Sequence, residues 1–129
     1  MTFDEAHRLI KKGDLVSLRR ELAAGTSADL VNQFSWTLLM LAALEGNTTI
    51  GEFLISEGAT IDKTNDFGET ALSLAAHAGH VGFISVLLAH GASTHCRPHG
   101  HTLEDWMQVG SGLPRDKIKS ILDLIKDDR

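Results

Sequence analysis

The chain repeats itself with a period of 33 residues. Gly13, Gly46 and Gly79 follow one another at intervals of 33, and a second set of glycines, at positions 25, 58 and 91, keeps the same interval. A fixed period of this size indicates a stacked array in which each unit contacts only its neighbours. Such arrays mostly present an extended surface and seldom enclose a catalytic pocket.

One period predicts two short helices and a long connector. Residues 70–79 form an apolar stretch that ends at Gly79, and residues 81–90 carry apolar side chains at helical spacing before Gly91. Glycine just past a helix adopts positive φ without steric cost. We therefore predict an all-α solenoid of about four helix-turn-helix units with hairpin-like connectors.

The period divides one domain into an N-terminal capping unit (1–29), two full units (30–62 and 63–95) and a degenerate C-terminal capping unit (96–129). More charge is expected in the terminal units, because each shows one face to water. The last connector is one residue shorter than the one before it. The loop at 110–115, between the last two predicted helices, is longer than its counterpart and is either a contact site or a tolerated insertion. Asp116 is a candidate N-cap. The remaining predicted helices are residues 4–11, 15–23, 37–44, 48–56, 102–109 and 116–126.

Charge and composition narrow the function classes. The net charge is −5, and residues 45–69 hold six acids against Lys63 alone, so we expect no nucleic-acid partner. We expect no membrane association, because no run approaches the roughly 18 apolar residues of a membrane helix and the N-terminus lacks a secretory pattern. The single cysteine, Cys96, fits a reducing compartment. A cytoplasmic or nuclear monomer is expected.

No arrangement of residues indicates catalysis. The serines lack a glycine-flanked elbow, and no glycine-rich loop is followed by Lys-Ser or Lys-Thr. We therefore expect no enzyme activity and no cofactor.

Six of the seven histidines lie between His77 and His101. The group His95, Cys96, His99 and His101 contains zinc-ligand types, but its spacing is not a recognised ligand pattern, so no metal is expected. Protonation of the cluster near pH ~6.5 would place positive charge beside the acidic middle, which leaves a pH-dependent affinity as an alternative.

The repeated text resembles the ankyrin repeat. Thr-x-Leu opens the first helix at Thr37 and Thr70, Leu-Ala-Ala follows within it, and Gly-Ala closes each second helix at positions 58–59 and 91–92. The proline and histidine usual after the threonine are missing: the residues there are Leu38, Met40, Ala71 and Ser73. In the last unit Glu104 and Trp106 replace expected leucines.

The resemblance implies a module that binds a partner protein, as a scaffold, adaptor or inhibitor. Its concave face would consist of the connector tips and the ends of the first helices. Mapped onto this chain, with Lys11 and Lys12 at its start, the implied partner-binding residues are Gln33, Phe34, Trp36, Leu44, Glu45, Asp66, Phe67, Glu69, His77, Ala78, His99 and His101. Phe34, Trp36 and Phe67 would form an apolar anchor, ringed by Glu45, Asp66 and Glu69.

Alternatives stay open at this point. The chain could be a regulatory or accessory subunit of an enzyme complex, or a self-associating structural protein that uses the neutral back around Gly82, Ser85 and Ala89. The resemblance also implies possible hydroxylation at Asp62 or His95.

Overall fold

The computed structural model describes residues 1–127, and these contain eight α-helices in four antiparallel hairpins. The last two residues of the predicted C-terminal unit, 128–129, lie outside the described part. A 3₁₀ turn at Pro98–Gly100 precedes the last hairpin. The helices are α1 (Phe3–Lys12), α2 (Leu15–Ala23), α3 (Leu38–Glu45), α4 (Thr48–Ser56), α5 (Ala71–Ala78), α6 (Val81–Ala89), α7 (Leu103–Gln108) and α8 (Arg115–Asp127).

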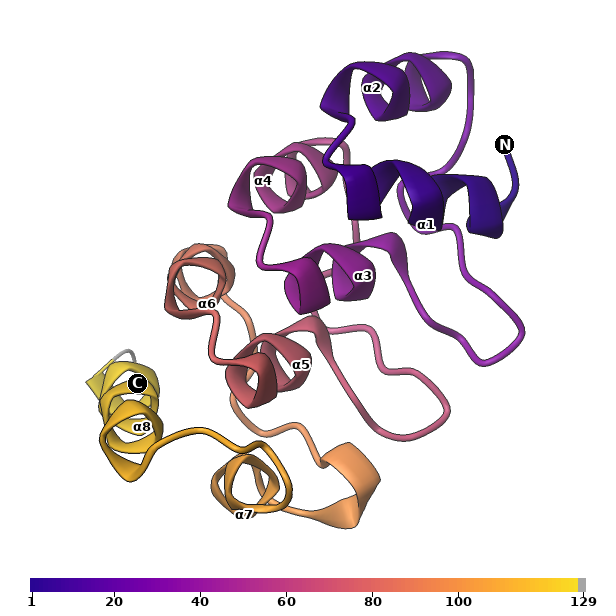
Figure 1. The fold of residues 1–129 in the computed structure, drawn as a ribbon. Helices are drawn as coiled ribbons and strands as arrows, with labels where there is room; N and C mark the ends of the chain where they lie inside the picture. Colours follow the sequence, from indigo (N-terminus) through magenta and orange to yellow (C-terminus); the bar gives the residue numbers. More distant parts are fainter. Residues whose placement is uncertain (128–129) are drawn as a thin grey trace.

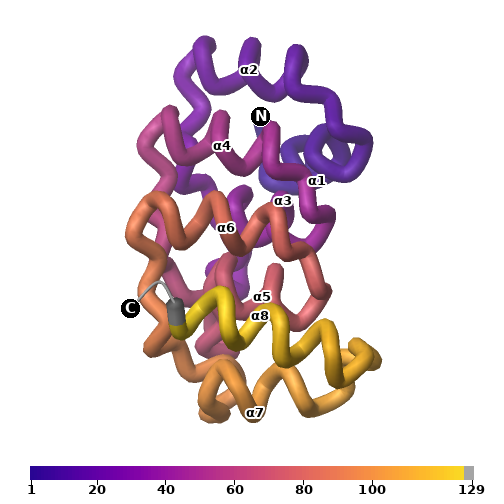
Figure 2. The backbone as a smooth tube through the Cα atoms, turned by 90° about the vertical axis from the view of Figure 1, so that its left-hand side faces the viewer, coloured from indigo at the N-terminus to yellow at the C-terminus, as the bar shows by residue number. Residues whose placement is uncertain are grey.

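The hairpins stack in two layers (Figure 1). The first helices α1, α3, α5 and α7 form one layer, and each contacts the next one along the array. The second helices α2, α4, α6 and α8 follow one another down the opposite side (Figure 2). The long connectors project beyond the first helices, away from the second layer. The all-α repeat solenoid predicted from the sequence is thus confirmed.

Threonine N-caps fix the start of α3 and α5. The Thr37 hydroxyl accepts from the Met40 amide at 3.1 Å, and the Thr70 hydroxyl accepts from the Ser73 amide at 3.2 Å. The side chains of Met40 and Ser73 accept from the threonine amides in return, at 3.5 and 2.9 Å. These capping boxes satisfy helix N-terminal donors, with Met40 and Ser73 as the reciprocal partners.

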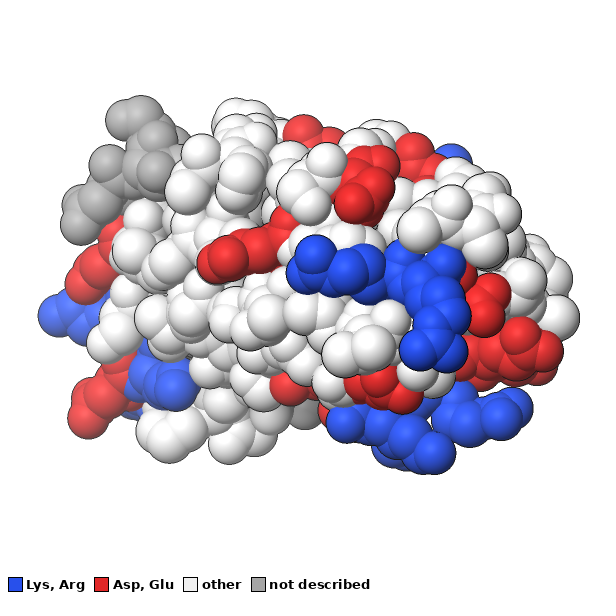
Figure 3. Space-filling view, turned by 90° about the horizontal axis from the view of Figure 1, so that it is seen from above, with Lys and Arg blue, Asp and Glu red and all other residues white. Residues whose placement is uncertain are grey.

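The core lies between the two layers and runs along the array without a break. The last hairpin closes it with polar side chains. Glu104 and Gln108 are exposed at positions where the preceding repeat buries Leu72 and Ala76. At the other end, seen from above in Figure 3, basic and acidic side chains are interspersed over the outer surface. Both ends therefore face water, as terminal repeats require. Among the largest fully buried side chains are Ile10, Leu18, Leu39, Ile50, Leu54, Leu72, Phe83, Ile84, Leu87 and Met107.

The predicted start of the last helix is wrong. Helix α8 begins at Arg115, so Asp116 lies in its first turn and is not the N-cap. The amide of Ile118 donates to the Pro114 carbonyl, which extends the helical bonding to the proline. An acid in the first turn still interacts favourably with the helix dipole.

Candidate protein-binding surface

The first connector tip is a tight turn built on Asn32. Its side-chain oxygen Oδ1 accepts from the amides of Phe34 and Trp36, each at 3.0 Å. The Ser35 amide donates to the Asn32 carbonyl at 3.1 Å and closes a four-residue turn, and Ser35 itself has φ of 63°. This geometry places Phe34 at the corner of the turn and reverses the chain before Trp36.

The second tip repeats this design 33 residues later. Asn65 Oδ1 accepts from the amides of Phe67 and Glu69, each at 3.0 Å, and the Gly68 amide closes the turn on the Asn65 carbonyl at 3.1 Å. Phe67 therefore occupies the corner position that Phe34 occupies one repeat earlier.

Backbone hydrogen bonds join each tip to the next. The Asp66 amide donates to the Phe34 carbonyl at 3.0 Å, and the His99 amide donates to the Phe67 carbonyl at 2.7 Å. In the last tip the residue equivalent to Asp66 is Pro98, which has no N–H to donate. His99 therefore both donates its amide to the Phe67 carbonyl and stacks its ring on Phe67. Its backbone is left-handed, with φ of 51°. A left-handed residue other than glycine costs about 1 kcal/mol.

Five rings follow one another in a series that we call the aromatic ladder, in which the first pair is tilted and the other three pairs are stacked: Phe34, Phe67, His99, Trp106 and His77. The ring centroids of Phe34 and Phe67 are 6.3 Å apart, and those of Phe67 and His99 are 5.6 Å apart. Trp106 of α7 lies between His99, at 4.8 Å, and His77 of α5, at 4.6 Å. Each such pair contributes roughly 0.5–1.5 kcal/mol beyond its buried area.

The ladder is partly open to solvent. Phe34 is 48% exposed and Phe67 is 43% exposed, and the His99 side chain is 44% exposed. Trp106 and His77 are half-buried. The indole N–H of Trp106 is buried and has no hydrogen-bond partner among residues 1–127, so stacking and packing against the core hold this ring.

Two predicted members of the surface lie elsewhere. Trp36 is half-buried and packs against the core, because the left-handed Ser35 turns the chain back between the two rings. Trp36 therefore does not project beside Phe34 and Phe67, as the sequence had suggested.

Glu69 is 7% exposed, so it does not ring the aromatic residues as a free acid. Its Oε1 accepts from the Asn65 side-chain amide at 2.9 Å, and its Oε2 lies 3.5 Å from His99 Nε2. A carboxylate buried in this way needs such partners, because loss of water disfavours the charge. Glu69 positions the second and third tips.

The ends of the first helices continue the surface. Leu44 is 41% exposed, and Glu45 and Ala78 are exposed. The remaining predicted positions, Gln33, Asp66 and His101, together with Lys11 and Lys12, are also exposed. Asp66 is thus an exposed carboxylate next to Phe67, and Glu45 is an exposed carboxylate at the end of α3.

Two histidines link this row of helix ends. His80 Nε2 lies 2.9 Å from the Leu44 carbonyl, and His77 Nε2 lies 2.9 Å from the Val109 carbonyl. In each case the ring nitrogen is the donor, because the carbonyl can only accept. Both bonds connect neighbouring repeats and fix the last turn of a first helix.

Sequence reasoning missed Asn32, Asn65 and Trp106. The two asparagines are 33 residues apart and precede aromatic residues in the same position, so the repeat register could have identified them. No such signal exists for Trp106, since its stacking partners come from a connector and from another helix.

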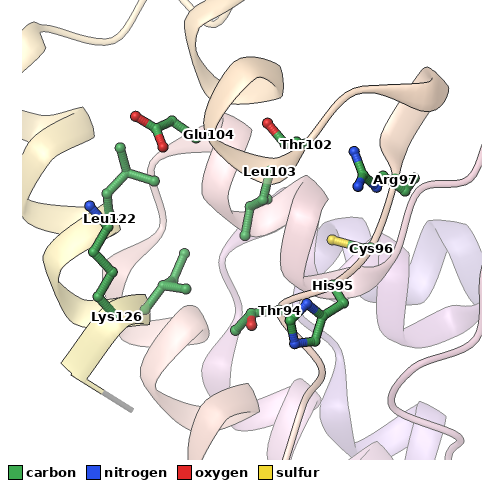
Figure 4. A pocket seen from close by; sticks show the side chains of 10 residues that line it. Thr94, His95, Cys96, Arg97, Thr102, Leu103, Glu104, Leu122 and Lys126 are labelled. Carbon is green, nitrogen blue, oxygen red and sulfur yellow. The ribbon is translucent and has the colours of Figure 1, made fainter. Parts of the chain in front are cut away.

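A second concavity lies between the last connector, α7 and α8 (Figure 4). It has a volume of about 270 Å³. Cys96 and Arg97 line one side, Leu122 and Lys126 the opposite side, and Leu103 lies between them. Burial raises the pKa of the Cys96 thiol. Basic and acidic side chains are mixed around the cleft, so its lining favours neither an anionic nor a cationic ligand.

The other candidate features were located as well. Residues 1–127 contain no group of three His, Cys, Asp or Glu side chains that could hold a metal ion, and no helix among them is long and apolar enough to cross a membrane. The loop at 110–115 is partly anchored, because Leu113 is half-buried and lies over Gly79. On the back, Gly82, Ser85 and Ala89 are exposed.

The family model for ankyrin repeats, in three copies, matches residues 6–98. This match covers most of the chain, which therefore belongs to the ankyrin-repeat family. Ankyrin repeats are in general modules of protein–protein interaction and typically have no enzyme activity. A search of curated proteins finds no significant match to this chain.

Proposed function

We propose that this protein is a binding module that acts as a scaffold, adaptor or inhibitor and docks one partner protein on its concave face. The observation that carries the proposal is the row of exposed, neighbouring rings on consecutive tips, with Phe34 48% and Phe67 43% exposed. Large aromatic side chains near the centre of a contact surface dominate binding energy.

The mechanism is presentation by a rigid surface. Asn32 and Asn65 hold the two tips, and the amides of Asp66 and His99 lock each tip to the preceding one. A surface ordered in advance loses little conformational entropy when a partner docks. The chain would act as a monomer in the cytoplasm or nucleus, where a free Cys96 stays reduced.

Charge indicates what the partner should offer. Asp66 is exposed next to Phe67 and Glu45 is exposed at the end of α3, whereas α5 and α6 contain no Asp, Glu, Lys or Arg. An apolar insert flanked by basic residues would match this arrangement, because complementary charge favours encounter and correct register.

The test is affinity capture from the native cell with matched variants. Phe34→Ala and Phe67→Ala together remove the exposed rings, and Val16→Ala removes a side chain that is 70% exposed on α2, on the opposite layer. We expect the double variant to lose the specifically retained protein and Val16→Ala to keep it. Equal recovery with both variants would place the docking surface elsewhere.

A further inference from the structure

We infer that the ladder is incomplete at Phe34 and that the partner completes it with an aromatic side chain. The inference rests on the proposed function and names the chemistry that the partner brings to one end of the concave face. Two unfilled positions, one on the backbone and one on a ring, lie on adjacent residues of the same turn.

The backbone position is the amide of Gln33. In the next tip the equivalent residue, Asp66, donates its amide to the Phe34 carbonyl of the preceding tip. Gln33 is exposed, and its amide has no hydrogen-bond partner within residues 1–127. An exposed unpaired amide next to a hydrogen-bonded series is a site where another backbone can add.

The ring position is the outer face of Phe34. Phe67, His99 and Trp106 each already have two ring neighbours in the ladder, and His77, at its other end, is half-buried on α5. Phe34 has a single ring neighbour among the described residues, Phe67, and is 48% exposed.

One partner residue can fill both positions, because within the chain Phe34 makes the equivalent two contacts with the second tip. Its carbonyl accepts from the Asp66 amide while its ring packs on Phe67. A partner residue in the same relation would accept from the Gln33 amide and stack on Phe34. Neither Gln33 nor Phe34 carries charge, so an uncharged aromatic residue in a turn is the matching occupant.

The ladder does not offer this occupant to a second copy of the chain. His99 of the last tip stacks on Trp106, and the ring at the other end of the ladder, His77, belongs to helix α5 and not to a turn. Head-to-tail continuation from one copy to another would therefore lack the ring that Phe34 needs. The asymmetry of the ladder favours a different protein.

Gln33→Pro is the decisive variant, because it removes the amide hydrogen and leaves Phe34 in place. Gln33 follows Asn32 in its turn, and this second turn position favours proline. The last tip already carries Pro98 at the equivalent position. Gln33→Ala is the matched control, since it removes the side chain and keeps the amide. Circular dichroism and the urea midpoint would show that both variants fold.

The probe is a phage-displayed library of short disulfide-closed loops, panned against the full chain. The selected loops are then synthesised and their dissociation constants measured. We expect an aromatic residue at one fixed loop position, and binding weakened at least about tenfold by Gln33→Pro and Phe34→Ala but less than about twofold by Gln33→Ala.

Two other results separate this inference from the proposed function. Loops that lose affinity with Leu44→Ala or Phe67→Ala but bind Gln33→Pro normally would overturn the inference and leave the docking face in place. Loops whose binding no concave-face variant changes would overturn both. Self-association of the wild type that Gln33→Pro abolishes would also overturn the inference, in favour of a second copy.

Discussion

Replacing Gly51 with alanine tests how tightly neighbouring repeats pack. Gly51 lies inside α4, and a β-carbon added there would be 2.6 Å from Cε2 and 2.7 Å from Cζ of Phe83 in α6. Phe83 is 0% exposed, so its rigid ring cannot move out into solvent to relieve the contact. Overpacking of this kind costs about 1–3 kcal/mol.

Gly82→Ala is the matched control. Gly82 also lies inside a second helix, but it is exposed, and an added β-carbon would be 3.6 Å from the Thr48 methyl carbon, an ordinary contact. Alanine gains about 1 kcal/mol over glycine in a helix interior. This gain applies to both variants, so the difference in unfolding free energy between Gly82→Ala and Gly51→Ala should be about 1–3 kcal/mol.

Urea unfolding monitored by circular dichroism measures this difference, provided that the dependence on urea is the same for all variants. We expect Gly82→Ala to be more stable than the wild type, and Gly51→Ala to fall clearly below Gly82→Ala. If Gly51→Ala stabilised the protein as much as Gly82→Ala, α4 and α6 would not pack as closely as described. The array would then not be rigid enough to present a surface ordered in advance.

Three further predictions concern other parts of the fold. Gly68→Ala should destabilise more than Gly91→Ala by about 1 kcal/mol or more in urea. Both glycines have positive φ, but only at Gly68 would a β-carbon meet a backbone oxygen, at 2.5 Å; equal losses would contradict this. Hydrogen bonds from Ser17 lower the pKa of Asp14 in the folded protein. Ionised Asp14 should therefore make the wild type more stable than Asp14→Asn. This advantage is complete above pH ~4 and is lost as the pH falls through the folded-state pKa. Melting temperatures should show this advantage disappear in acid, and a constant difference down to pH ~2 would refute it. Burial raises the pKa of Cys96, so at neutral pH a thiol reagent should modify the native protein much more slowly than the urea-unfolded chain, and similar rates would show that the thiol is accessible.

The repeat register predicted most of the architecture. The 33-residue spacing of Gly46 and Gly79 located the turn inside each central hairpin, because a helix that ends at glycine leaves its turn in a fixed place. Boundaries were less certain, since Thr37 and Thr70 were placed inside helices that they cap. The sequence alone does not distinguish a threonine that caps a helix from a threonine in its first turn.

The orientation of the surface residues could not be predicted in the same way. Phe34 and Trp36 are both aromatic and two residues apart, and only the left-handed Ser35 sends one outward and the other to the core. Glu69 is another case, because its burial depends on Asn65 and on His99, which the fold brings from the next connector. Such partners are set by three-dimensional contacts between repeats and not by local pattern.

The most direct test of the docking face is amide hydrogen exchange of the chain, free and bound to the captured partner. If the partner binds the concave face, exchange should slow at residues 33–36 and 66–69 and around the end of α3 near Leu44. Exchange in α2, α4 and α6 should change little. Protection confined to those second helices, with unchanged exchange at both tips, would contradict the claim that the concave face binds the partner.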